Sequence, residues 1–152
     1  MSLTSAPWVL DTHIWIRTLS GDPLLNRPPF LEQLAFLSRQ CALLLASISL
    51  WETAMLVSKG RLTLTMPVQE WMDTALIRGG ITVIPLTTEI STDSAALPGT
   101  FHGDPADRII VATARRHNAT LITLDRKILS FGEEGWVHST SPGSARTLPP
   151  TE

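Results

Sequence analysis

The sequence predicts an α/β fold in which a central parallel sheet is covered by helices on both faces. Short segments that are apolar throughout recur along the chain, and they alternate with longer segments of helical periodicity. Strands without an apolar–polar alternation are typical of parallel sheets, because both of their faces are buried. A length of 152 residues fits one domain with its own core.

Strands are expected where apolar or β-branched residues run without interruption for a strand's length. In chain order these segments are 8–10, 42–46, 81–86, 120–124 and a short last one at 135–138. The longest apolar run, from Cys41 to Trp51, is interrupted by Ser47 and Ser49 and falls far short of the ~20 residues of a membrane-spanning helix. We therefore expect no membrane association.

Helices are expected between the strands, at positions given by start and stop signals. In chain order they cover 13–19, the apolar stripe of 30–37 after two prolines, 50–58, 68–77, 88–97, 105–117 and a short turn at 126–129. Ser47 or Ser49 could cap the third of them. The helix at 105–117 has the strongest signals, with Asp104 at its N-cap, Pro105 in its first turn and Asn118 just past its end.

Composition and charge exclude several classes of protein. With 43% apolar and 17% charged residues the chain is not disordered, and a net charge of −2 argues against a basic nucleic-acid coat. A single cysteine, Cys41, excludes a disulfide scaffold and favours a reducing environment. Residues 1–6 lack the pattern of a signal peptide, so we expect a cytoplasmic protein. The Ser-, Pro- and Thr-rich segment 139–152 is expected to be a flexible tail, which leaves 7–138 as the domain.

Acidic residues recur where the predicted strands end. Asp11 follows the first strand and Asp125 the fourth, and Glu52 lies about one helical turn past the second. Asp104 and Asp107 lie three residues apart in the first turn of the helix at 105–117, hence on one face. Functional residues of an open parallel sheet gather outside the carboxyl ends of its strands. The pattern therefore predicts that these five carboxylates share one cleft.

Carboxylates that share a cleft repel and raise one another's pKa values. A divalent cation removes this conflict, and oxygen ligands of this kind suit Mg²⁺ or Mn²⁺. Such a cation can activate a water, neutralise phosphate oxygens and stabilise a leaving alkoxide. The acids therefore indicate metal-dependent phosphodiester hydrolysis.

Other interpretations of the same acids stay open at this level. Asp11, Asp104 and Asp125 could serve only as helix N-caps, and Asp107 could serve only the helix dipole. Glu52 is harder to explain in this way, because it follows two apolar residues in a stretch where a carboxylate rarely lacks a partner. Asp11 could also be a phosphatase nucleophile, but the Asp-x-Asp pattern of haloacid-dehalogenase-type sites is absent.

Four segments carry a resemblance to a known family. They are Val9–His13 (VLDTH), Ser47–Glu52 (SISLWE), His102–Ile110 (HGDPADRII) and Thr120–Asp125 (TLITLD). In order and spacing they resemble the motifs of PIN domains, and most of all those of VapC-type toxins of bacterial toxin–antitoxin pairs, over about residues 8–138. The resemblance implies a three-layer α/β/α Rossmann-like domain with a central parallel sheet. It also implies a metal-dependent endoribonuclease that is restrained by a cognate antitoxin.

The resemblance also implies roles for individual residues. The acidic positions of the family match Asp11, Glu52, Asp107 and Asp125, which would bind Mg²⁺ or Mn²⁺, and Asp104 belongs to the Asp-Pro-x-Asp-Arg form of the third motif and would face the same site. Either Asp104 or Asp107 could ligate the metal directly.

The hydroxyl positions beside these acids are Thr12 and Thr123, which would hold carboxylates or water in place. One departure from the family is Leu56, which stands where many relatives carry a lysine. The nearest lysine is Lys59, so no role in substrate or partner contact is carried over for it.

Basic residues near the acidic motifs are candidates for binding RNA phosphates, namely Arg108, Arg126 and Lys127. Without the five candidate acids the chain has 12 basic against 9 acidic residues, a mildly basic balance. A solvated helix face is the alternative, and Arg108 could instead pair with a neighbouring carboxylate.

An apolar region follows the first two motifs and includes Trp15, Trp51, Met55 and Leu56. Most of it is expected to be core, and part of it could be a groove for the antitoxin, as in VapC-like proteins. The resemblance also implies a homodimer. A catalytically silent PIN-like module that binds nucleic acid or protein is the alternative to the ribonuclease.

Overall fold

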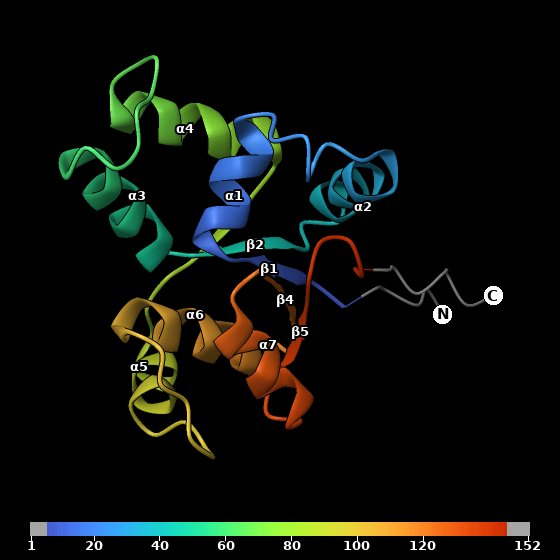
Figure 1. Ribbon diagram of the computed structural model, residues 1–152, viewed down its shortest axis with the longest axis vertical. Helices are drawn as coiled ribbons and strands as arrows, with labels where there is room; N and C mark the ends of the chain where they lie inside the picture. Colours follow the sequence, from blue (N-terminus) through green and yellow to red (C-terminus); the bar gives the residue numbers. More distant parts are fainter. Residues whose placement is uncertain (1–5, 146–152) are drawn as a thin grey trace.

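The computed structural model describes residues 6–145 and has a five-stranded sheet between two layers of helices (Figure 1). In chain order the elements are β1 Trp8–Leu10, α1 Thr12–Leu19, α2 Pro28–Arg39, β2 Leu43–Ala46, α3 Ile48–Ser58, α4 Val68–Gly79, β3 Thr82–Ile84, α5 Thr88–Ala95, α6 Pro105–Arg116, β4 Thr120–Ile122, α7 Arg126–Glu133 and β5 His138–Thr140. This confirms the predicted three-layer α/β/α architecture.

The sheet is parallel throughout and its strand order is β3-β2-β1-β4-β5. Strand β1 is central, with Val9 paired to Leu44 of β2 on one side and to Leu121 of β4 on the other. The chain continues from β1 to β2 in one direction and later returns to the opposite side as β4. The boundary between β1 and β4 is therefore the topological switch point, where an open α/β sheet forms its functional crevice.

Each face of the sheet has its own core. Helices α1, α2 and α4 lie over one face, and α5, α6 and α7 lie over the other (Figure 1). Because successive side chains of a strand point to opposite faces, Leu10 joins the first core and Val9 the second. Both residues are fully enclosed, which explains why the strand is apolar throughout.

Element boundaries differ from the expected ones by at most two residues, except near the end of the domain. There α7 has eight residues where a short turn was expected, and β5 occupies 138–140 instead of 135–138. After α7 the chain passes through Gly135, which adopts a left-handed φ of 91°, and enters β5 at His138. Ser139 and Thr140 thus belong to β5 and not to the predicted tail, of which residues 146–152 lie outside the described part.

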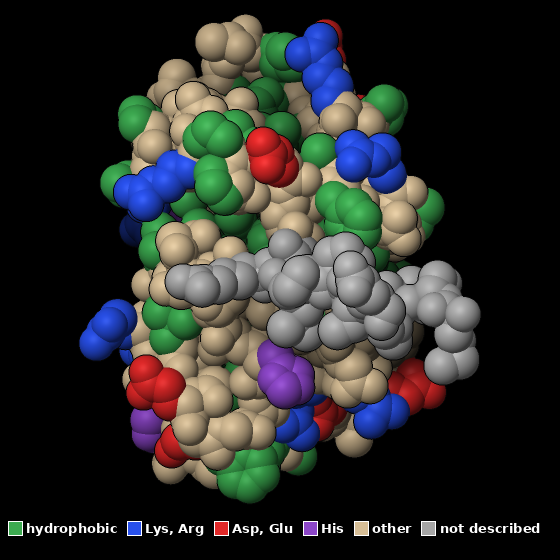
Figure 2. Space-filling model, turned by 90° about the vertical axis from the view of Figure 1, so that its right-hand side faces the viewer, with side chains coloured by type: hydrophobic (Ala, Val, Ile, Leu, Met, Phe, Trp, Pro, Cys, Tyr) green, Lys and Arg blue, Asp and Glu red, His purple; other side chains and the backbone are tan. Residues whose placement is uncertain are grey.

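The surface is mixed in charge. Acidic and basic side chains of the described residues are scattered over the face of the molecule that Figure 2 shows. Within residues 6–145, no helix combines the length and the apolar character that crossing a membrane requires.

Candidate active site

The N-terminal ends of α1, α3 and α6 lie at the same edge of the sheet (Figure 1). Asp11 follows β1 as the N-cap of α1, and Asp125 follows β4 as the N-cap of α7. Strands β1 and β4 are hydrogen-bonded neighbours, and the backbone N–H of Asp11 donates to Ile122 O over 3.0 Å. Two of the predicted acids therefore follow adjacent strand ends at the switch point.

Asp11 is the most enclosed of the five acids, with 6% of its surface exposed. Its Oδ1 accepts from the Thr12 backbone N–H over 2.8 Å, and its Oδ2 accepts from Thr123 Oγ1 over 2.7 Å. Burial raises the pKa of Asp11, and the hydrogen bonds from Thr123 and Thr12 act in the opposite direction. The carboxylate is thus held in one orientation at some cost to its ionised form.

Glu52 is tied to the same region through a chain of hydroxyl groups. Thr12 Oγ1 lies 2.6 Å from Glu52 Oε1 and 2.8 Å from Ser49 Oγ. A threonine hydroxyl has one hydrogen to donate, so Thr12 donates to the carboxylate and accepts from Ser49. Burial is the main reason why the pKa of Glu52 is raised; Thr12 lowers it, and the charges of Asp11 and Asp104 raise it further.

Asp104 caps α6, since its Oδ1 accepts from the Asp107 backbone N–H over 2.8 Å. The pKa of Asp107 is raised to about 7, first by burial and then by the charge of Asp104. The charges of Asp11, Asp125 and Glu52 contribute in the same direction. All five predicted acids therefore act on one another electrostatically, although they are spread over more than a hundred positions of the sequence.

Three of the five acids cap helices and can still belong to one shared site. Asp11, Asp104 and Asp125 each cap a helix through Oδ1 alone. Within residues 6–145, the other carboxylate oxygen of Asp104 and of Asp125 accepts no hydrogen bond from the protein. Each cap therefore fixes the side chain and leaves oxygen lone pairs for a further partner.

The chemistry of these donors fits a hard divalent cation better than any other partner. All of them are carboxylate or hydroxyl oxygens, and the two ion pairs of the described residues, Arg17–Asp22 and Arg115–Asp93, lie elsewhere. Within the same part of the chain, no three Asp, Glu, His or Cys side chains are close enough together to form a ready-made ligand set. Metal binding by these residues would therefore require the carboxylates to move closer together.

The guanidinium of Arg108 donates hydrogen bonds to backbone carbonyls, and neither ion pair of the described residues includes it. Its Nε donates to Ser94 O over 2.8 Å and its Nη1 to Phe101 O over 2.9 Å. Both acceptors lie before α6, near the end of α5 and in the following loop. The guanidinium of Arg108 thus fixes the segment that leads into Asp104. Its binding to RNA stays a prediction.

The predicted antitoxin groove is not continuous. Trp15 is fully buried and packs edge-on against Trp71 of α4, with ring centroids 5.3 Å apart, so it belongs to the core. Trp51 is 56% exposed, and Met55 and Leu56 are partly buried. The exposed or partly buried residues of this region thus lie on α3, and their contact with an antitoxin stays a prediction.

Two residues of the site were missed by sequence reasoning. Ser49, expected as an N-cap, is buried inside α3 and completes the hydroxyl chain to Glu52. Gly103 has no room for a side chain, because a Cβ would lie 2.3 Å from Phe101 Cε2 and 2.9 Å from Asp107 Cβ. The spacing of Ser49 from Glu52, one helical turn, was the signal that could have identified it.

These features define a Rossmann-like α/β/α domain with an acidic site at the carboxyl edge of its parallel sheet. The chain belongs to the PIN domain family, whose model matches residues 8–134.

Among curated proteins, the chain is 38% identical over 88 residues to Ribonuclease VapC22 of Mycobacterium tuberculosis. That match spans 58% of this chain and 66% of the relative, slightly less than two thirds of its length.

Solved structures with the same fold are toxin–antitoxin complexes. VapBC2 of Rickettsia felis, bound to a promoter DNA fragment, superposes with a TM-score of 0.66 at 21% identity, covering 88% of this chain and 97% of the other. DNA-bound VapBC of Salmonella typhimurium gives a TM-score of 0.64 at 17% identity, covering 90% and 98%. At these identities the likeness establishes the fold.

Proposed function

We propose that this protein is a Mg²⁺- or Mn²⁺-dependent endoribonuclease that acts as the toxin of a toxin–antitoxin pair. The observation that carries the proposal is that Thr12 and Thr123 connect Asp11 to Glu52 and to Asp125 by hydrogen bonds at the carboxyl edge of the sheet. Burial and the charges of these acids and of Asp104 also raise the pKa of Asp107. Without a counter-ion this concentration of negative charge destabilises the folded protein. The name of the curated relative, a ribonuclease, supports the same activity.

In this proposal Asp11, Glu52, Asp107 and Asp125 hold the cation, and Asp104 assists them. When bound, the cation would orient and activate a water for attack on phosphorus, neutralise phosphate oxygens and stabilise the departing oxygen.

The residues around the acids act by positioning. Thr123 and Thr12 donate hydrogen bonds of 2.7 and 2.6 Å to the carboxylates of Asp11 and Glu52, which restricts the orientations of these two side chains. A positive charge on His13 lowers the pKa values of Asp11 and Glu52.

The proposed partner is an antitoxin protein that covers the acidic site. Support comes from the structural relatives, which are complexes of a toxin with its antitoxin. The exposed Trp51 on α3 lies one residue from Glu52 and could anchor such a segment. A homodimer and a cytoplasmic location belong to the same proposal.

Cleavage of RNA by purified protein tests the activity. We expect Mn²⁺ or Mg²⁺ to be required, EDTA to stop cleavage, and Asp11→Asn to abolish it while the protein stays folded. Asp73→Asn, at an exposed position of α4, is the matched control and should cleave like wild type. Cleavage that survives both EDTA and Asp11→Asn would contradict the proposal. RNA binding without cleavage under any metal would favour the catalytically silent module.

The toxin role has its own test. Induced expression of the wild-type chain should arrest bacterial growth, and expression of Asp11→Asn should not. Growth arrest by both variants to the same extent would separate toxicity from the acidic site and reject this part of the proposal.

A further inference from the structure

The hydroxyl of Thr12, at the start of α1, lies between two residues of α3, the helix against which α1 packs. Its Oγ1 is 2.8 Å from Ser49 Oγ and 2.6 Å from Glu52 Oε1. Ser49 and Glu52 are three positions apart, so they share one face of α3. One residue of α1 therefore links a serine to an acid of the proposed site on the neighbouring helix.

The two hydroxyl groups of this link are shielded from water. Ser49 and Thr12 are fully buried, whereas Glu52 is partly buried. Within residues 6–145, the hydrogen bond from Thr12 is the one that the carboxylate of Glu52 accepts from the protein. The orientation of Glu52 therefore depends on Thr12, and a hydrogen bond without competing water is well suited to fix it.

The number of hydrogens in the link gives Ser49 its role. Two hydroxyl groups supply two hydrogens, and the ionised carboxylate of Glu52 can only accept. The hydrogen of Thr12 goes to Glu52, which leaves Ser49 to donate to Thr12. A hydroxyl that accepts while it donates forms the stronger hydrogen bond, because the two bonds polarise one another. Ser49 thus strengthens the contact that restrains Glu52.

The formation of α3 does not explain a buried serine at this place. Serine near the start of a helix commonly caps a backbone N–H. The N-cap of α3 is Ser47, whose side chain makes no capping hydrogen bond within the described part of the chain. Ser49 lies inside the helix, and its hydroxyl is bonded to Thr12 of another element.

We propose that Ser49 is a positioning residue of the ribonuclease and holds the carboxylate of Glu52 at the acidic site through the hydroxyl of Thr12. This inference rests on the proposed function. A displaced Glu52 changes the geometry around the reacting phosphate and leaves the other contacts to the RNA in place. The loss of Ser49 should therefore lower kcat more than it raises KM.

The test compares Ser49→Ala with Thr53→Val, its matched control. Thr53 is also buried in α3, and its hydroxyl donates to Ser49 O over 2.8 Å, within the helix itself. Each variant removes one buried hydroxyl of α3, so both should lower the melting temperature by a similar ~2–5 °C. We expect only Ser49→Ala to lower kcat, by about three- to tenfold, with KM changed by about twofold at most.

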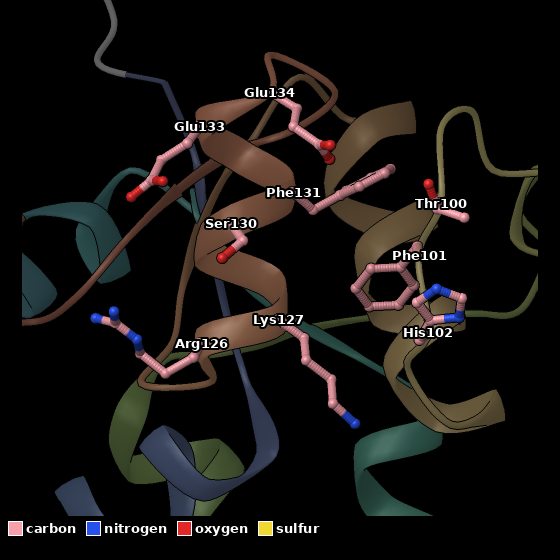
Figure 3. A pocket seen from close by; sticks show the side chains of 9 residues that line it. All are labelled: Thr100, Phe101, His102, Arg126, Lys127, Ser130, Phe131, Glu133 and Glu134. Atoms are coloured by element: carbon pink, nitrogen blue, oxygen red, sulfur yellow. The ribbon is translucent and has the colours of Figure 1, made fainter.

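A serine on another helix provides the second control. Ser130 is exposed on α7, at a cavity between this helix and the segment that precedes α6 (Figure 3). Ser130→Ala makes the same chemical change as Ser49→Ala at a position outside the link. It should match wild type in both kcat and melting temperature.

A double-mutant cycle shows whether Ser49 acts through Thr12. In a Thr12→Val background the link is already broken, so adding Ser49→Ala should lower kcat by about twofold at most. Thr12→Ser keeps the hydroxyl, and in that background Ser49→Ala should retain most of its effect. Equal losses of kcat on adding Ser49→Ala to wild type and to Thr12→Val would overturn the proposal.

The outcomes separate this inference from the proposed function. If wild type cleaves RNA and Ser49→Ala loses no more kcat than Thr53→Val, the positioning role is overturned and the ribonuclease stands. If wild type cleaves no RNA, carbon-13 NMR of the Glu52 carboxyl group in the metal-free protein at pH 8 decides. A resonance that Ser49→Ala moves further than Thr53→Val does supports the link to Glu52, and one that it moves no further overturns it.

Discussion

Thr123 donates its hydroxyl hydrogen to Asp11 Oδ2 over 2.7 Å, although the two residues are 112 positions apart. The same hydroxyl accepts from the backbone N–H of Asp125 over 2.9 Å. One side chain thus links the ends of β1 and β4 and fixes an acid on each. Thr123 is therefore a positioning residue, and we expect its replacement to lower both stability and activity.

Replacing Thr123 by valine keeps the volume and removes this donor. We expect the free energy of unfolding to fall by about 1–3 kcal/mol at pH 8, because the buried carboxylate of Asp11 loses a hydrogen bond. RNA cleavage should fall about 10- to 100-fold. Chemical denaturation and initial rates measure the two effects. Thr123→Ser should restore most of both, and wild-type activity in Thr123→Val would reject the positioning role.

Asp107 should destabilise the metal-free protein at neutral and higher pH. Its pKa is raised to about 7, so the folded protein holds this proton more tightly than the unfolded chain does. The stability that protonation contributes is present at low pH and is lost as pH rises through about 7. At pH 8 without metal, we expect the free energy of unfolding of Asp107→Asn to exceed that of wild type by roughly 1–2 kcal/mol, after allowance for solvent screening. The variant should therefore unfold at a higher temperature.

The dependence of this stability difference on pH and on metal provides the control. At pH 5 Asp107 is protonated in the folded protein, and the advantage of Asp107→Asn should shrink. Saturating Mn²⁺ at pH 8 should stabilise wild type more than the variant, because a cation replaces the missing proton. Thermal unfolding that is identical for both proteins at pH 8 would contradict the pKa of Asp107 and the electrostatic interaction among the five acids.

Arg108 should matter for stability and not for the charge of the RNA-binding surface. Arg108→Ala removes charge-assisted hydrogen bonds to Ser94 O and Phe101 O and should cost about 2 kcal/mol. Arg108→Lys should not restore this, since one ammonium cannot reproduce the planar fork of the guanidinium. The slope of RNA affinity against salt should stay unchanged in both variants, and a reduced slope would support the predicted contact of Arg108 with RNA phosphates.

Gly103 should tolerate no side chain while Phe101 is present. The Cβ of an alanine would lie 2.3 and 2.5 Å from two ring carbons of Phe101, so Gly103→Ala should cost about 1–3 kcal/mol of stability. In a Phe101→Ala background the same substitution should cost much less. Denaturation of the four proteins gives the coupling energy of this pair, and additive effects would contradict the close contact.

The sequence predicted the parts of this protein that depend on local signals. A buried strand shows as an unbroken apolar run, and β1 lies where the run Trp8–Leu10 placed it. Helix α6 begins after the cap Asp104 and ends at Arg116, with His117 as its C-cap and Asn118 in the left-handed conformation at a φ of 49°. Acids at strand ends could be expected to meet because the strands are parallel and end at one edge.

Partners that depend on folding in three dimensions could not be predicted in this way. Arg108 lies in an acidic motif, but its hydrogen-bond acceptors are carbonyls brought to it by the packing of α5 against α6. Trp15 follows a motif closely, yet the side of α1 on which it lies faces Trp71. The spacing of residues does not contain this information, because the sequence does not show which backbone carbonyls or helix faces will lie next to a side chain in the folded protein.

The position of β1 in the middle of the sheet has a consequence for the synthesis of the protein. The ribosome makes β1 and Asp11 before the other described strands, and β4, which flanks β1 on its second side, follows more than a hundred residues later. A nascent chain that has not yet emerged beyond Asp125 lacks Thr123 and one of the acids, so it has no complete site. The proposed ribonuclease activity therefore requires nearly the whole of the described domain to have left the exit tunnel.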